Sequence, residues 1–130
     1  MSARSERLVL LAAAVLSLAL AGCDPDVEAA RVLRRADQQV SAGKPDQARK
    51  LYRQYLQQAS QLGATRDIAT EMDVHRKLAG LEADAHHWHT ARSLLKQALA
   101  EAFVIQSRAE AADCRDRLKR LDEQIKGSER

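Results

Sequence analysis

Apolar residues recur every three or four positions along most of the chain, which is the spacing of one face of an α-helix. In the first such segment they are Ala29, Val32, Leu33, Ala36 and Val40. Further segments show the same spacing, and their apolar stripes lie within residues 48–62, 68–85, 91–105 and 111–125. The pattern predicts an all-α fold of about five helices.

Polar and turn-forming residues separate the stripes. Gly43 and Pro45 are expected to end the first helix and begin the second, because glycine is common just after a helix and proline in its first turn. The other boundaries are predicted at Gly63, at Asp67 and at a polar turn of His86 and His87, with Thr90 as the N-cap of the fourth helix. Short turns therefore connect the helices.

A shift of 43 residues superposes several core positions of the chain on one another. The matching pairs are Ala48 and Ala91, Leu51 and Leu94, Leu56 and Leu99, Ala59 and Ala102, Leu62 and Ile105, Ala69 and Ala112, and Leu78 and Leu121. Such a period indicates a repeated supersecondary unit, here a helical hairpin. The helical part is predicted to contain two and a half copies of it.

The composition agrees with this interpretation. The 130 residues include only four aromatic residues, five glycines and two prolines, and they are rich in the residues that favour long helices. A chain of this length is expected to form one domain.

The N-terminal segment has the features of an export signal. Arg4 and Arg7 make its start basic, residues 8–20 form an apolar run, and small residues follow up to Cys23. As a helix the apolar run would be roughly 20 Å long, whereas the hydrocarbon core of a bilayer is about 30 Å thick. A processed signal is therefore favoured over a permanent transmembrane helix.

Leu20, Ala21, Gly22 and Cys23 resemble a bacterial lipobox. The resemblance implies cleavage before Cys23 and acyl chains such as palmitate on its thiol. An ordinary secretory signal with a chance cysteine is the alternative. The predicted organisation is a signal peptide at 1–22, the lipidated cysteine with a short tether at 23–26, a helical domain at 27–126 and a frayed tail at 127–130.

This resemblance also implies a location in the bacterial cell envelope, facing the periplasm. Asp24 follows the modified position and resembles the residue with which lipoproteins are left in the inner membrane, so the inner membrane is favoured over the outer. Cys114 would then be the one remaining thiol. Its place on the stripe of Ala111, Leu118 and Leu121 favours a buried structural role, while an intermolecular disulfide stays open.

Gly43, Ala48 and Tyr52 resemble the turn glycine, small residue and aromatic residue of a tetratricopeptide repeat (TPR). The second copy departs further, with Leu95 in place of the aromatic and His86 in place of the glycine. The period also exceeds the usual one of about 34 residues. The resemblance implies TPR-like antiparallel hairpins that stack into a short right-handed solenoid.

In TPR-like arrays the first helix of each hairpin lines a groove that takes a peptide or a partner helix. Transferred through the 43-residue register, the groove residues expected in this chain are Asp37, Val40, Asp73, Arg76, Asp116 and Lys119. An ordinary solvated face is the alternative for any one of them. The predicted partner is another envelope protein or peptide, and the sequence leaves the oligomeric state open.

His86, His87 and His89, beside Trp88, are the only clustered residues that suggest a metal site. A polar turn is the favoured interpretation, because no ligand pair with helical metal-binding spacing accompanies them. The sequence contains no catalytic or phosphate-binding motif, so neither an enzyme nor a cofactor other than the lipid on Cys23 is predicted.

The charge balance does not point to nucleic acid. Without residues 1–22 the chain has 19 basic and 17 acidic residues, and both signs are interspersed along the helices. We therefore predict an adaptor or assembly factor of an envelope complex, such as a secretion or pilus system. The alternative is a small regulatory or exclusion-type lipoprotein that occupies an envelope machine and is gated by metal at His86, His87 and His89.

Overall fold

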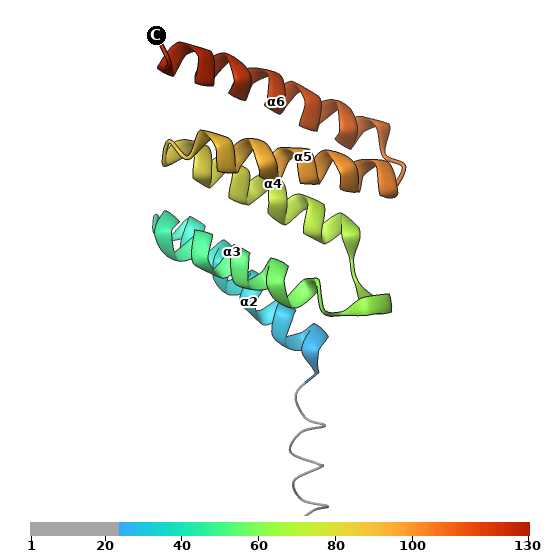
Figure 1. Ribbon diagram of the computed structural model, residues 1–130. Coiled ribbons are helices and arrows are strands. Elements are labelled where there is room, and N and C mark those ends of the chain that lie inside the picture. Colours follow the sequence, from blue (N-terminus) through green and yellow to red (C-terminus); the bar gives the residue numbers. More distant parts are fainter. Residues whose placement is uncertain (1–23) are drawn as a thin grey trace, which may run out of the picture.

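The computed structural model of the protein describes residues 24–130, which form five α-helices and one short 3₁₀ helix (Figure 1). They are α2 (Pro25–Ser41), α3 (Pro45–Ala59), η1 (Gly63–Thr65), α4 (Ile68–Asp84), α5 (Trp88–Val104) and α6 (Arg108–Ser128). The predicted all-α class is thus confirmed for these residues, which contain no strand. The predicted signal peptide and Cys23 lie outside the described residues.

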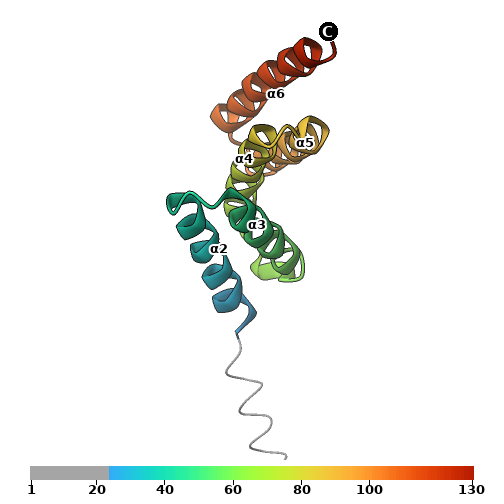
Figure 2. The same cartoon turned by 90° about the vertical axis from the view of Figure 1, so that its left-hand side faces the viewer.

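The helices are arranged as two hairpins and a final helix. α2 packs against α3 in the first hairpin, α4 packs against α5 in the second, and α6 lies along α5. Consecutive helices run in opposite directions, and the first hairpin, the second hairpin and α6 follow one another from the bottom to the top of the molecule (Figures 1 and 2). The contact between hairpins is made chiefly by α3 and α4.

The backbone repeats itself at the 43-residue interval seen in the sequence. Gly43 and His86 both have left-handed φ angles, of 70° and 62°, and Gly63 and Gln106 have φ angles of 60° and 57°. After α2 the amide of Lys44 donates to the carbonyl of Gln39, and equivalent 6→1 bonds from the amides of His87 and Ser107 close α4 and α5 directly before the next helix begins. The two hairpin turns are therefore built alike.

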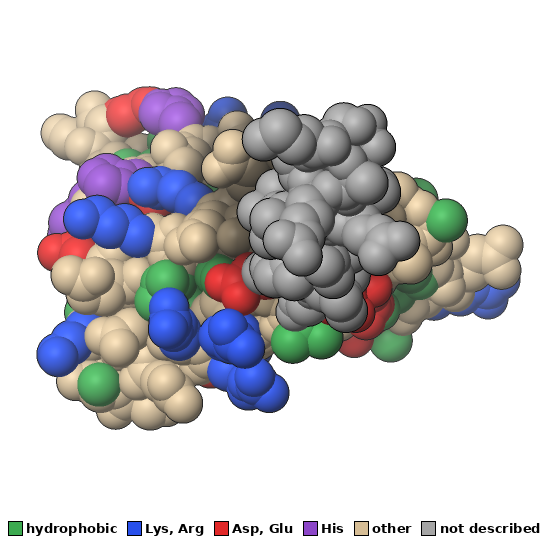
Figure 3. Space-filling view, turned by 90° about the horizontal axis from the view of Figure 1, so that it is seen from below, with side chains coloured by type: hydrophobic (Ala, Val, Ile, Leu, Met, Phe, Trp, Pro, Cys, Tyr) green, Lys and Arg blue, Asp and Glu red, His purple; other side chains and the backbone are tan. Residues whose placement is uncertain are grey.

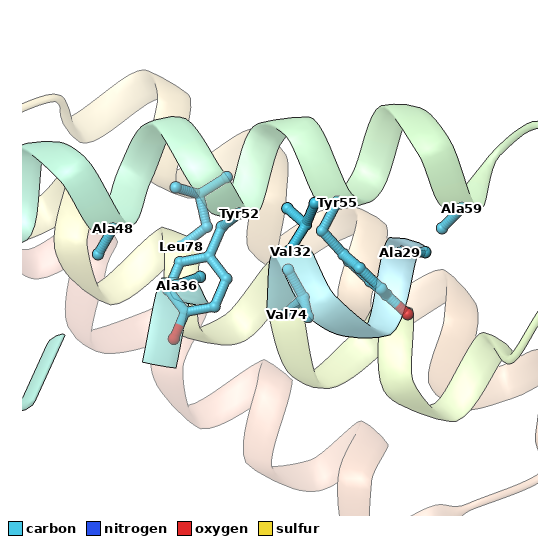
Figure 4. Close-up of a cluster of buried hydrophobic side chains, with 9 residues drawn as sticks. All are labelled: Ala29, Val32, Ala36, Ala48, Tyr52, Tyr55, Ala59, Val74 and Leu78. Carbon is cyan, nitrogen blue, oxygen red and sulfur yellow. The ribbon is translucent and has the colours of Figure 1, made fainter. Parts of the chain in front are cut away.

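Nine buried side chains form the core of the first hairpin and its junction with α4 (Figure 4). They are Ala29, Val32, Ala36, Ala48, Tyr52, Tyr55, Ala59, Val74 and Leu78. The alanines let the helix backbones approach closely, and the two tyrosines fill the space that remains. Val40 was predicted on the same apolar stripe but is 45% exposed.

The second hairpin and α6 share further buried clusters. Ala98 and Ala102 of α5 pack with Ala111 and Cys114 of α6, and a second group joins the other end of the same helices. Cys114 is fully buried and forms no disulfide within residues 24–130. Burial raises the pKa of its thiol, so the neutral form expected of a structural cysteine is favoured.

Some helix boundaries differ from the predicted ones. α2 begins at Pro25, inside the expected tether, because the side chain of Asp24 caps it by accepting a hydrogen bond from the amide of Asp26. α6 continues to Ser128, past the expected end at 126. Thr90 is not the N-cap of α5, since that helix begins at Trp88 and His87 holds the cap position.

Three glutamates are buried in the helical layers, which the apolar pattern did not predict. Two oxygens of Glu71 receive hydrogen bonds of 3.0 and 2.7 Å from Arg66. Glu82, which has no exposed surface, is held by Arg53 of α3. Glu101 lies 2.6 Å from the Nδ1 atom of His75, but the alignment is too poor for a hydrogen bond. Glu82 thus joins α4 to α3, Glu71 pairs with the connection that precedes α4, and Glu101 of α5 faces His75 of α4.

Candidate binding surface

The first helices of the hairpins and α6 form one surface, which we call the groove face. Between α2 and α4 it contains a first cavity of about 310 Å³, lined by Asp37, Val40, Ser41, Tyr52, Lys77 and Leu81. Between α4 and α6 it contains a second cavity of about 270 Å³, whose lining includes Arg76, Gly80, Ala83, Leu95, Arg120 and Gln124. Each cavity thus lies where successive first helices meet.

The two cavities are equivalent in the repeat. A shift of 43 residues carries the lining of the first cavity to Gly80, Ala83, Asp84, Leu95, Arg120 and Gln124. All of these except Asp84 line the second cavity. The groove face is therefore a repeated surface, and the differences between its two cavities are differences of side chain at matched positions.

The charged side chains that line the first cavity pair with groups of the protein itself. The Oδ1 atom of Asp37 accepts a 2.5 Å hydrogen bond from the hydroxyl of Tyr52 and a 3.3 Å one from the ammonium of Lys77. Lys77 also lies 3.1 Å from Asp73. Burial alone would lower the pKa of Lys77, but hydrogen bonds and charges of Asp73 and Asp37 outweigh it and raise this pKa.

Tyr52 is the buried end of this arrangement. Its side chain is 1% exposed, and burial, followed by the hydrogen bond to Asp37, raises the pKa of its hydroxyl well above the usual value of 10.0. The hydroxyl therefore remains a donor at all ordinary pH values. It holds Asp37 in one position on the groove face.

Ion pairs also connect α4 with α6 beside the second cavity. Arg76, whose side chain is 15% exposed, pairs with Glu110 and lies 3.1 Å from Asp113. Asp113 in turn accepts a 2.8 Å hydrogen bond from Arg117. Burial lowers the pKa of Arg76, but the charges and hydrogen bonds of Glu110 and Asp113 raise it overall. Arg76 is thus a structural link and is little exposed to a partner.

Protein-family models, curated proteins and solved structures give no match for this chain. The groove face is therefore interpreted from its own residues.

The predicted groove residues lie at different places on this surface. Asp37 and Val40 line the first cavity, Arg76 lines the second, and Asp73 pairs with Lys77. Asp116 and Lys119 are exposed on α6 and belong to neither lining. Instead α6 contributes Arg117, Arg120, Leu121 and Gln124.

The histidine turn lies at the end of the molecule where α4 joins α5 (Figure 3). The Nδ1 atom of His87 is 2.6 Å from Glu82, and the ring of His86 meets Trp88 edge to face with centroids 5.1 Å apart. Within residues 24–130 no three His, Cys, Asp or Glu side chains are grouped as metal ligands. The two contacts hold these histidines in the turn.

The outer face of the first hairpin, on the side away from α4, is basic. A shallow cavity of about 1010 Å³ between α2 and α3 is lined by Arg35, Lys44 and Lys50, with Leu51 among its other residues. These three cations form no ion pair with any described residue. Viewed from below, several basic side chains lie around a small hydrophobic patch, with an acidic side chain beside it (Figure 3).

No helix within residues 24–130 combines the length and the apolar character that crossing a membrane requires.

Proposed function

We propose that the protein is a lipid-anchored binding module of the bacterial cell envelope, which holds a peptide or a helix of another envelope protein on the groove face. The observation that carries this proposal is the pair of equivalent cavities between successive first helices. The repeat places one hollow at each junction, so that the two lie in line along the groove face. Two hollows in line suit an elongated ligand that contacts both.

The arrangement that we propose for the hairpins is a short TPR-like right-handed solenoid. The recurring left-handed residues support it, since Gly43 and His86 give the two hairpins the same internal turn, and Gly63 and Gln106 recur in the connections that follow each hairpin. α6 would act as the cap. Its outer side carries exposed polar residues such as Arg115, Asp116 and Lys119 in place of another apolar stripe.

The proposed anchor is the acylated thiol of Cys23. Because Asp24 already caps α2, such an anchor would join the folded domain almost directly and keep it close to the bilayer. Arg35, Lys44 and Lys50 on the outer face of the first hairpin would then meet anionic headgroups, which attract such cations by about 1 kcal/mol each. The inner membrane, facing the periplasm, is the proposed location.

In this role the protein is an adaptor or assembly factor of an envelope complex, such as a secretion or pilus system, and performs no chemistry of its own. The lipid fixes where the protein acts, and the groove face selects what it holds. A partner bound through the groove face would contact the first hairpin, the second hairpin and α6 together.

A crosslinking pull-down from native membranes tests the proposal. The groove variant carries Val40→Glu and Gln124→Glu, because both side chains are exposed and each lines one cavity. Arg76 is unsuitable, since its ion pairs to α6 would be lost. The matched control carries Ser93→Glu and Gln97→Glu, two exposed positions of α5.

The wild type and the control are expected to recover one defined envelope complex. The groove variant is expected to recover it at least about tenfold less, which corresponds to about 1.4 kcal/mol of binding free energy. The full chain with Cys23→Ser is expected to leave the membrane fraction. Equal recovery by the groove variant and the control would contradict the proposed role of the groove face.

A further inference from the structure

At the matched lining positions, the second cavity lacks one charge that the first cavity has, and Arg76 and Arg117 line the second cavity in addition. In the first cavity Asp37 occupies the junction and receives hydrogen bonds from Tyr52 and Lys77. Its counterpart in the second cavity is Gly80, where an added Cβ atom would meet nothing within 4 Å. The second cavity therefore has open space at the position that a carboxylate fills in the first.

Lys77, the cation that pairs with Asp37 in the first cavity, has a cationic counterpart in the second. Arg120 is the counterpart of Lys77 and is exposed on α6. Within residues 24–130 it forms no ion pair, whereas Lys77 pairs with Asp37 and Asp73. The second cavity thus has no acid at the position of Asp37, but it has a cation at the position of Lys77.

Two acids beside this cavity are already engaged, and Asp84 of α4 and Asp116 of α6 form no ion pair with Arg120. Asp113 accepts from Arg117 and pairs with Arg76, and Glu110 pairs with Arg76 as well. Neither of them lies within ion-pair distance of Arg120. The free cation is therefore available to an acid that comes from outside the chain.

The surroundings of Arg120 favour a carboxylate attached to a chain. Ala83 and Leu95 line the same cavity and replace Val40 and Tyr52, so one wall is apolar and offers no hydroxyl donor. A guanidinium can hold both oxygens of a carboxylate in parallel hydrogen bonds. The apolar wall excludes water on one side and accommodates the methylene groups of the acidic side chain.

We propose that the second cavity binds an Asp or Glu side chain of the partner, seated on Arg120 in the place that Asp37 occupies in the first cavity. The inference rests on the proposed function and adds the chemistry of the ligand to it. The partner segment presents an acidic residue to the junction of α4 and α6. Gly80 determines specificity because a side chain there would fill the site.

The test compares two variants of nearly identical shape. Gly80→Asp supplies the missing carboxylate from within the chain, and Gly80→Asn is its uncharged control. The full chain in detergent micelles is titrated with a blocked oligoglutamate peptide, and with an oligoglutamine peptide as the ligand control. The signal is the NMR shift of the Arg120 Nε–H group, which Arg120→Gln identifies by removing it.

The wild type is expected to bind oligoglutamate and to shift the Arg120 signal, and Gly80→Asn is expected to bind more weakly because its side chain takes up space in the site. Gly80→Asp is expected to bind at least about tenfold more weakly than Gly80→Asn, and its Arg120 signal should already be shifted without peptide. Arg120→Gln should also lose binding. Circular dichroism of all variants checks that the helices remain folded.

Equal affinity of Gly80→Asp and Gly80→Asn would overturn the inference, and so would unchanged binding by Arg120→Gln or no binding by the wild type. The titration needs no natural partner, so its result is separate from that of the membrane pull-down. If oligoglutamate binds as described but the pull-down shows no loss in the groove variant, the site is real and the proposed envelope role is wrong.

Discussion

Tyr52 shows how a single side chain connects the core of this protein to its surface. Its ring packs among the buried residues of the first hairpin (Figure 4), while its hydroxyl donates a hydrogen bond to Asp37 on the groove face. A hydrogen bond to a charged group contributes about 1.5–3 kcal/mol when the donor is sheltered from water. The position of Asp37, and through it that of Lys77, therefore depends on the core.

Tyr52→Phe is expected to lower the free energy of unfolding at neutral pH by about 1–2 kcal/mol, because Asp37 loses its buried donor but keeps Lys77 and solvent. The pKa of Tyr52 is raised in the folded state, so above pH 10.0 the unfolded chain releases this proton first and the wild type loses stability as pH rises. The Tyr52→Phe variant should lose less stability over the same rise in pH, because it has no proton to release at this position. Urea unfolding at neutral and alkaline pH measures both effects.

Tyr55→Phe is the matched control for this prediction. Tyr55 is also buried, and burial followed by the charge of Glu71 raises the pKa of its hydroxyl, but no hydrogen bond contributes to the shift. Its removal should therefore cost less at neutral pH. If both variants were equally stable at neutral pH, the bond between Tyr52 and Asp37 would not support the groove face.

The buried glutamates mark the limit of prediction from apolar spacing at this scale. Glu71 and Glu82 lie on the same face of α4 as Leu78, so they occupy core positions that the pattern had no reason to fill with acids. Their partners are Arg66 and Arg53. The spacing of Glu71 from Leu78 was a usable signal that Glu71 is buried. The pairing of Glu82 with Arg53, which lies on another helix, could not be assigned without the structure.

At the scale of the elements, glycine and proline did not mark every helix end. Gly63 was expected to end the second helix, but α3 already ends at Ala59 and Gly63 begins η1. Gly43 and Pro45 gave the first turn correctly. The turn after α4 contains neither glycine nor proline. Thr90 was predicted as the N-cap of the next helix, whereas His87 holds that position in the structure. His86 adopts the left-handed conformation that Gly43 adopts in the first turn, which only the repeat register suggested.

The repeated turns predict opposite effects of substitution at two of them. Gln106 has a φ of 57° after α5, so Gln106→Gly should raise the free energy of unfolding by about 0.5–1 kcal/mol by relieving strain. Gly43→Ala, at a φ of 70° with open space around it, should lower that free energy by about 1 kcal/mol. Thermal unfolding of the two variants measures these changes, and a stabilising Gly43→Ala would contradict the turn geometry.

At the scale of the whole molecule, the repeat predicted the groove face but not all of its residues. At each junction the earlier helix contributes positions such as Asp37 and Val40, and the later helix contributes positions such as Lys77 and Leu81. The same register leads to Arg120 and Gln124 on α6. Sequence reasoning transferred Asp73 and Arg76 instead and so reached Asp116 and Lys119, which lie beyond the junction.

The charge distribution predicts how the molecule would lie on a bilayer. In vesicles that contain the full, lipidated chain, Lys44 and Lys50 should react with a soluble amine reagent about fivefold more slowly when the vesicles are anionic than when they are zwitterionic. Lys96 and Lys126, exposed on α5 and α6, are the internal controls and should not change. Salt of about 1 M, which shortens the screening length to about 3 Å, should abolish the difference. Equal protection of all four lysines would contradict this orientation.

The most direct test of the groove face is photo-crosslinking from single positions in native membranes, because it reports contact without disturbing the ion pairs. A photoreactive residue at Val40 and one at Gln124 place the probe in the first and second cavities. Probes at Ser93 and Gln97 of α5 are the controls. The account predicts the same crosslinked partner from both cavity positions and none from the controls. Adducts from α5 but not from the cavities would show that the partner binds elsewhere and that the groove face is only a solvated surface.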